Sequence, residues 1–179
     1  VYNPRTSSFL NGLALGETDD DVFFYAAEDR HGAIGVPPEE RIAHIRELRP
    51  DIGALNMGSV NYLKYSSKRK QFVWDFTFQN NMSEIMFFVN EMNKAGVKPE
   101  CECFDTGHVN NSHHLIEMGV LKTPPDYSLI LGSGGTAAEP EDLLHIIRKL
   151  PVGATWKTIP VSHATWRLTA TALVVGGNI

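Results

Sequence analysis

The chain has 179 residues, 42% of them apolar and 21% charged, with a formal net charge of −5. This composition is typical of a soluble globular protein with one sizeable core, and the net acidity argues against a nucleic-acid partner. No apolar stretch reaches the roughly 18 residues of a membrane helix, and no signal-peptide pattern is present. Because the two cysteines are spaced C-x-C, we expect reduced thiols and a cytoplasmic protein.

The first part of the chain alternates between strand-like and helical patterns, which is typical of βα units and a parallel sheet. Val1–Asn3 is predicted to end a strand, and residues 9–36, rich in Gly and Asp, are predicted to form a surface insertion. A helix is predicted to begin at Pro37–Glu40 and to lead into a strand at Asp51–Asn56. A loop then precedes the strand-like aromatic run Phe72–Phe78.

The second part continues this alternation with amphipathic helices and short apolar strands. In chain order we predict a helix at Met82–Ala95 stopped by Gly96, a strand from Val97, a helix at Ser112–Met118, a strand at Tyr127–Leu131, a helix from Glu139, a strand at Ala154–Ile159 and a helix at His163–Val174. The pattern predicts a single α/β domain over residues 1–179, with about five of the eight units of a (β/α)8 TIM barrel.

The strand from Val97 is unusual because it carries two carboxylates in a segment predicted to be buried. The pleat places Glu100 and Glu102 on one face, and Cys101 and Cys103 on the other. Burying an unpaired carboxylate costs several kcal/mol, so each acid needs a partner or a function. The cysteines are expected to pack as small apolar residues under the helices.

Position along the strand separates the two acids. Glu102 lies near the carboxyl end, where chemistry occurs in such folds, so we predict that it contacts substrate or orients a metal-bound group. An ion pair of Glu102 with Lys98 or Lys157 is the structural alternative. Glu100 lies deeper, and we predict that it forms a structural ion pair.

Three histidines follow this strand, but they do not form a convincing metal site. His113 and His114 are adjacent on a predicted helix and point about 100° apart, so they cannot easily share a metal. His108 lies at the strand-to-helix turn and is the one with a possible view of the pocket.

Polar or glycine-rich turns follow three other strands. Gly132–Thr136 could cradle a phosphate with its backbone N–H groups, or it could be a tight βα turn that needs positive φ. Asn56 ends one strand and can hydrogen-bond a substrate carbonyl or carboxylate. The hydroxyls of Thr6 and Ser7 follow the first strand and offer donors at the same edge of the sheet.

Four segments together resemble the β-keto acid cleavage enzyme family, whose founding activity cleaves 3-keto-5-aminohexanoate with acetyl-CoA. They are R-P-D-I-G-A-L-N-M-G-S-V-N-Y at 49–62, G-V-K-P-E-C-E-C-F-D-T-G at 96–107, L-G-S-G-G at 131–135, and G-A-T-W at 153–156 with G-G-N-I at 176–179. The resemblance covers nearly the whole chain apart from the insertion. The motif P-E-x-E followed by F-D-x-G is fairly specific, and the order of the four segments strengthens it.

The resemblance implies a TIM barrel with one divalent metal, usually zinc. The family holds this metal with an H-x-H pair on the second strand and a Glu on the eighth. This chain contains no H-x-H pair and ends before the R-x-G-x-E-D segment of the family, so we expect the metal ligands to lie outside it. No residue of this chain is assigned as a ligand.

The same resemblance assigns roles to individual residues. It implies that Glu102 and Asn56 are catalytic-site residues that contact substrate, and that Thr6 or Ser7 corresponds to the serine of a substrate-binding turn. Asn80 corresponds to a pocket Asn. Gly132, Gly134 and Gly135 would bind the CoA diphosphate or shape the mouth of the pocket. Ala54 replaces a Thr of the founding member, which indicates a different substrate preference.

The implied reaction is a metal-assisted retro-Claisen condensation of a β-keto acid with acetyl-CoA, giving acetoacetate and an acyl-CoA. We expect a homo-oligomer with no membrane or nucleic-acid partner. Two alternatives remain at this point: another TIM-barrel lyase or aldolase, or a non-catalytic fragment that lacks the metal site.

Overall fold

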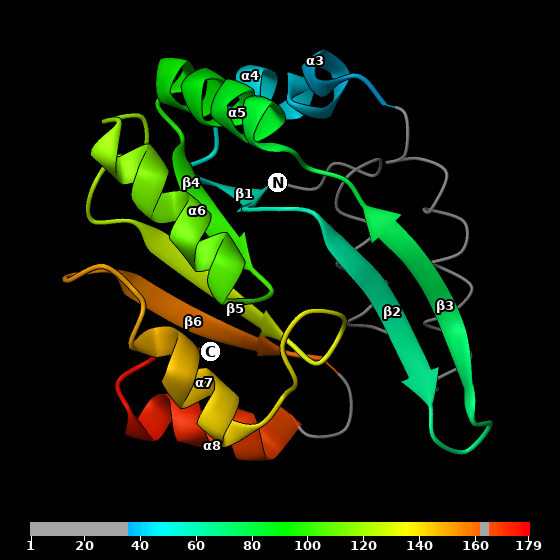
Figure 1. The fold of residues 1–179 in the computed structure, drawn as a ribbon. Coiled ribbons are helices and arrows are strands. Elements are labelled where there is room, and N and C mark those ends of the chain that lie inside the picture. The colour runs from blue at the N-terminus through cyan, green and yellow to red at the C-terminus, as the bar shows by residue number, and fades with distance from the viewer. Residues whose placement is uncertain (1–35, 162–164) are drawn as a thin grey trace.

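A four-stranded parallel sheet forms the centre of the computed structural model, which describes residues 36–161 and 165–179 (Figure 1). The strands lie in the order β1 (Ile52–Asn56), β4 (Lys98–Cys103), β5 (Asp126–Leu131) and β6 (Thr155–Pro160). Each neighbouring pair is parallel, which confirms the predicted α/β class. The predicted strand Val1–Asn3 lies outside the described residues, and so does the predicted insertion except for residue 36.

The helices pack on one face of this sheet (Figure 1) and form the main core with it. They are α3 (Pro38–Arg41), α4 (Ala43–Leu48), α5 (Met82–Ala95), α6 (Thr106–Glu117), α7 (Pro140–Ile147) and α8 (Thr165–Val174). Cys101 and Cys103 are fully buried in this core, which confirms their predicted packing role. Burial raises the pKa of the Cys101 thiol to about 12, so the thiol is unreactive at neutral pH.

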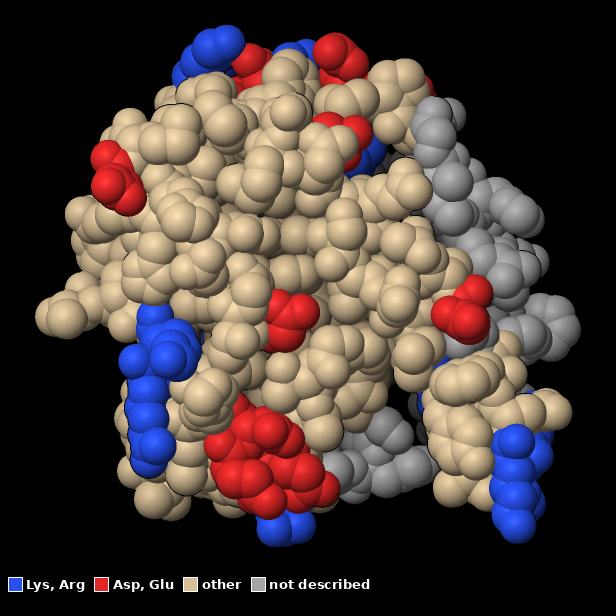
Figure 2. All heavy atoms as spheres, viewed as in Figure 1, with Lys and Arg blue, Asp and Glu red and all other residues tan. Residues whose placement is uncertain are grey.

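Helix α5 begins and ends as its sequence predicts, and α7 begins as predicted. The side chain of Asn81 caps α5 by accepting the N–H of Glu84 at 3.1 Å, and Gly96 ends the helix. The start of α7 carries the acidic residues Glu141 and Asp142 beside Glu139, where the helix dipole favours negative charge. These acids form a red patch over the start of α7 (Figure 2).

Helix α6 begins at Thr106, whereas the sequence predicted Ser112. The prediction was wrong because it assigned the residues around His108 to a strand-to-helix turn. The carboxylate of Asp105 accepts the N–H of His108 at 3.0 Å, so this segment is the capped first turn of the helix. The polar run that follows lacks an obvious apolar stripe, yet it buries Val109, Ser112 and Leu115.

An antiparallel hairpin follows β1, formed by β2 (Val60–Ser66) and β3 (Gln71–Phe78). The sequence predicted a loop where β2 lies, and this prediction was wrong. The aromatic run is a strand, as its composition indicated. Val60 and Tyr62 pack with Phe104 and Ile130 on the sheet face opposite the helices, which we call the second face. The hairpin therefore covers the carboxyl ends of β4 and β5 (Figure 1).

Candidate active site

The second face carries two rows of residues that cross the four strands, and all of these residues except Ala54 are polar. Residues paired across parallel strands share a face, so register alone places them together. The upper row, nearer the carboxyl ends, is Asn56, Glu102, Ser128 and Lys157, and the lower row is Ala54, Glu100, Asp126 and Thr155. The structure thus brings together Glu102 and Asn56, the two residues predicted to be catalytic.

Lys157 ties the lower row together. Its Nζ lies 3.0 Å from Glu100 Oε1 and 3.2 Å from Asp126 Oδ2. The hydroxyl of Ser128 donates to the same Glu100 oxygen, and the hydroxyl of Thr155 donates to Asp126 Oδ1 at 2.6 Å. Glu100 is therefore a structural ion pair, as predicted. Burial lowers the pKa of Lys157, but the hydrogen bonds and charges of the two carboxylates outweigh it and raise the pKa.

Glu102 lies beside this network without joining it. It is 8% exposed, and among the described residues no Lys or Arg forms an ion pair with its carboxylate, so the predicted alternative partners Lys98 and Lys157 do not serve it. Burial and the negative charge of Glu100 raise the pKa of Glu102 to about 7, while Lys157 lowers it. A carboxyl of this kind exchanges its proton near neutral pH.

Asn56 is held by its backbone while its side chain lacks a partner. The Nδ2 of Asn80 donates to the Asn56 carbonyl at 2.5 Å, and Arg41 donates to Asn80 Oδ1 at 3.5 Å. Asn80 is 2% exposed and its amide is used on both sides, so it positions the end of β1. The Oδ1 of Asn56 is buried and accepts no hydrogen bond from the described residues, which leaves an acceptor next to Glu102.

The glycine loop after β5 is a tight turn packed against the hairpin. Gly132, Gly134 and Gly135 all have positive φ, which is the structural alternative given by the sequence. Ser133 Oγ donates to the Leu63 carbonyl at 3.2 Å. A Cβ at Gly134 would lie 2.1 Å from the Asn61 carbonyl oxygen. The loop therefore fixes the hairpin over the second face.

The histidines serve the fold. His108 is buried, and its Nδ1 accepts the N–H of Phe104 at 3.3 Å while its Nε2 faces the Ser59 carbonyl at 3.2 Å. Because Nδ1 is an acceptor, the proton of the neutral ring lies on Nε2 and is donated to that carbonyl. His113 and His114 are exposed on α6, where they contact the Lys149 carbonyl and the Asn110 side chain.

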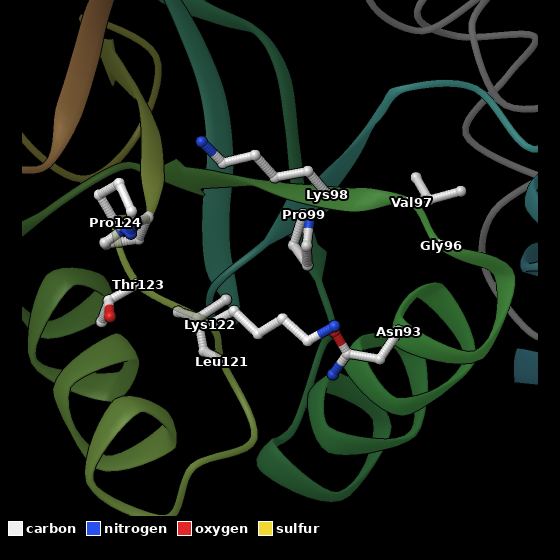
Figure 3. A pocket seen from close by; sticks show the side chains of 10 residues that line it. Asn93, Gly96, Val97, Lys98, Pro99, Leu121, Lys122, Thr123 and Pro124 are labelled. Atoms are coloured by element: carbon white, nitrogen blue, oxygen red, sulfur yellow. The ribbon is translucent and has the colours of Figure 1, made fainter.

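A pocket of about 320 Å³ lies at the other end of the sheet (Figure 3). It is lined by Lys98 and Pro99 at the amino end of β4 and by the segment Leu121–Pro125 before β5. Neither polar row lines it. The residues described at 36–161 and 165–179 contain no group of three or more His, Cys, Asp or Glu placed to hold a metal ion, and none of their helices could cross a membrane. Thr6 and Ser7 lie outside the described residues.

The sheet is parallel, and two polar groups lie where its strands β1 and β4 end. One is an acid with a pKa near neutral pH, and the other is an amide whose oxygen has no partner among the described residues. This is the construction of an enzyme site. The sequence comparisons are specific: the model of the β-keto acid cleavage enzyme family matches residues 14–179. The chain belongs to this family, whose members are enzymes.

Several relatives support this assignment. A 3-keto-5-aminohexanoate cleavage enzyme of Acetoanaerobium sticklandii is 30% identical over 149 residues, which cover 83% of this chain and 50% of the relative. A 3-dehydrocarnitine:acetyl-CoA trimethylamine transferase of Rhizobium meliloti is 28% identical over a region that covers 84% of this chain and 48% of the relative. A 3,5-dioxohexanoate:acetyl-CoA acetone transferase of Paraburkholderia graminis is 32% identical over a region that covers 61% of this chain and 40% of the relative. The chain spans about half the length of the curated relatives it matches.

The raised pKa of Glu102 predicts a specific pH dependence of stability. Between its ordinary value of 4.5 and about 7, the folded state binds a proton that the unfolded state has lost. The free energy of unfolding therefore falls as the pH rises through this window. Relative to wild type, Glu102→Gln should gain about 3 kcal/mol between pH 4.5 and pH 8 in urea unfolding.

The control for this experiment is Glu141→Gln, at an exposed position on α7, which should change stability by less than ~0.5 kcal/mol. If the stability difference between Glu102→Gln and wild type were constant over this pH range, it would contradict the raised pKa of Glu102.

The fit between the glycine loop and the hairpin predicts a difference between two alanine variants. Gly134 and Gly153 have φ of +73° and +81°, but a Cβ at Gly153 meets nothing within 4 Å. Gly153→Ala should cost about 1 kcal/mol from backbone strain alone. Gly134→Ala adds a clash with the backbone and should cost ~3 kcal/mol. Equal losses in thermal unfolding would show that the loop does not fix the hairpin.

Proposed function

We propose that the protein carrying this chain is a β-keto acid cleavage enzyme. It would perform a retro-Claisen condensation of a β-keto acid with acetyl-CoA, in which C–C cleavage gives acetoacetate and a new acyl-CoA. Family membership supports this reaction, as do relatives named as acetyl-CoA transferases and cleavage enzymes. The cytoplasmic location and the homo-oligomer expected from the sequence remain predictions.

The architecture we propose is a TIM barrel, with residues 1–179 as part of one domain. The strand order β1-β4-β5-β6 follows the chain, and the helices cover one face, as in the wall of a barrel. After α8 the chain returns parallel to β6: Asn178 donates to the Trp156 carbonyl at 3.0 Å and accepts the N–H of Thr158 at 3.2 Å. This return adds a further parallel position beside β6. The second face would then line the barrel interior.

The observation that carries the proposed site is the pairing of Glu102 with Asn56. They are register partners on neighbouring strands, which lie about 4.8 Å apart. The buried Oδ1 of Asn56 has no hydrogen-bond partner among the described residues, and the buried Glu102 forms no ion pair with a described Lys or Arg. A substrate that brings donors to this position would replace the missing hydrogen bonds, whose absence costs about 1–3 kcal/mol per group.

Within this site we assign roles to the chain's own residues. The Glu102 carboxyl contacts the distal group of the substrate, and its neutral-range pKa lets it accept or donate a hydrogen bond. The Asn56 amide orients the substrate through its oxygen and its Nδ2. Asn80 acts behind it by fixing the β1 carbonyl. Thr6 and Ser7 remain proposed donors to substrate oxygens. Gly132, Gly134 and Gly135 remain proposed to shape the pocket mouth or to meet the CoA diphosphate.

A metal does not fit the described residues alone. The acids Glu100 and Asp126 both pair with the Lys157 ammonium, which repels a cation, and no described group offers three ligands. The divalent metal expected from the resemblance, zinc in most members of the family, remains a proposal that requires ligands beyond these residues. We derive no step through it.

The alternative of a lysine-dependent aldolase has one observation in its favour, the Lys157 side chain on the second face. Schiff-base chemistry requires a neutral amine. The two carboxylates raise the pKa of Lys157 and hold it as an ammonium, so this reading is disfavoured. Failure of borohydride to trap a substrate on the protein would agree with this conclusion.

The proposed reaction is tested by incubating the full protein with acetyl-CoA and a panel of β-keto acids and measuring acetoacetate. We expect release with at least one substrate. Glu102→Gln should lower kcat/KM by about 10- to 100-fold, because a lost charged contact is worth roughly 1.4–2.8 kcal/mol. Glu141→Gln is the matched control and should retain activity. If the folded protein released no acetoacetate with any β-keto acid of the panel, the proposal would be refuted.

A further inference from the structure

Lys157 belongs to one row of the second face but bonds to the other. Its register places it beside Ser128 in the upper row with Glu102. Its ammonium nevertheless contacts Glu100 and Asp126 in the lower row. The Lys157 side chain therefore extends from the upper row to the lower row. Its ammonium contacts Glu100, which lies two residues before Glu102.

The position of the Glu100 carboxylate is strongly fixed. Its Oε1 takes both the Lys157 ammonium at 3.0 Å and the Ser128 hydroxyl. Asp126 is fixed in the same way by Lys157 and by the Thr155 hydroxyl at 2.6 Å. Two carboxylates thus share one cation, and the lower row keeps an excess of negative charge. Residues on one face of a strand are about 6.6 Å apart along it, so this charge acts directly on Glu102.

The charged and titratable groups around Glu102 come from several elements. Glu100 raises its pKa and Lys157 of β6 lowers it, while Tyr62 of β2 is a buried phenol close enough to feel the Glu102 charge. Cys103 neighbours Glu102 on β4 and is also influenced by this charge. The facing residues from β1 and β5, Asn56 and Ser128, do not titrate.

We propose that Lys157 is a positioning residue for Glu102: by clamping Glu100 and Asp126 it sets the charge beside the Glu102 carboxyl, and thereby the pH range in which the site works. The inference rests on the proposed function in one respect, that Glu102 contacts the substrate. Lys157 itself acts through Glu100 and touches no reacting atom in this scheme.

Two substitutions should therefore move the site in opposite directions. Lys157→Met keeps the length of the side chain but removes the cation, so the pKa of Glu102 should rise. Glu100→Gln keeps the shape but removes the nearest negative charge, so the pKa of Glu102 should fall. Lys157→Arg restores the charge and should return the behaviour toward wild type. A residue that merely supports the fold would not give shifts of opposite sign.

The experiment is a pH titration of the full protein by carboxyl ¹³C NMR, with the Glu102 resonance assigned by its loss in Glu102→Gln. The pH profile of kcat/KM is measured on the same proteins. We expect the Glu102 midpoint to move up by about one pH unit in Lys157→Met and down by a similar amount in Glu100→Gln. The profile of kcat/KM should move with it.

Midpoints that do not move, or that move in the same direction in both variants, would overturn the inference. If Lys157→Met does not fold, Glu100→Gln and Lys157→Arg decide: the first must lower the midpoint, and the second must leave it near the wild-type value. A protein without turnover on β-keto acids would refute the proposed function, whereas the NMR titration would still test the link between Lys157 and Glu102.

Discussion

Burying two acids on one face of a single strand is the constraint on which this sheet depends. Each ionised carboxylate loses hydration worth several kcal/mol, and only a cation or several donors can replace it. Lys157 of β6 supplies a cation, which reaches Glu100 and Asp126 but not Glu102. The network therefore satisfies the deeper acid and leaves the outer one with an unusual affinity for its proton.

The second requirement is a cover for the carboxyl ends of the strands, and the hairpin provides it through apolar contacts. Val60 and Tyr62 pack on Phe104 and Ile130 above the polar rows. The Tyr62 ring meets Phe104 edge-on with centroids 5.7 Å apart, a geometry that aromatic pairs favour. Covering the site in this way lowers the local dielectric, which explains why burial is the largest cause of the raised Glu102 pKa.

The sequence predicted most of the regular elements and the shared face of Glu100 and Glu102. The alternation of acids and cysteines in Val97–Phe104 correctly separated the Glu100 ion pair from the packed thiols, because a strand has a fixed period of two. The pairing of Asn56 with Glu102 could be expected only in outline, since register depends on contacts between strands distant in sequence. The contact of Asp126 with Lys157 was missed. An acid at the start of β5, next to the strand that carries Lys157, could have indicated it.

Other failures have local causes. The capped start of α6 was taken for a turn because Asp105 and Gly107 are common in both. Strand β2 was assigned to a loop because Asn61, Lys64 and Ser66 interrupt its apolar residues. Its burial comes from the sheet beneath it, which the sequence of β2 alone does not reveal. The substrate-binding role predicted for Asn80 stays a prediction, and its amide contacts Arg41 and the Asn56 carbonyl of β1.

His108 links three segments of the chain. Its ring joins the end of β4 through Phe104 to the turn after β1 through Ser59, while its backbone belongs to the first turn of α6. The ring is packed so closely on Gly58 that a Cβ there would lie 2.5 Å from it. The root of the hairpin and the start of α6 are thus mechanically coupled. Any movement that uncovers the polar rows must either displace this imidazole or pivot beyond it, in the outer part of the hairpin.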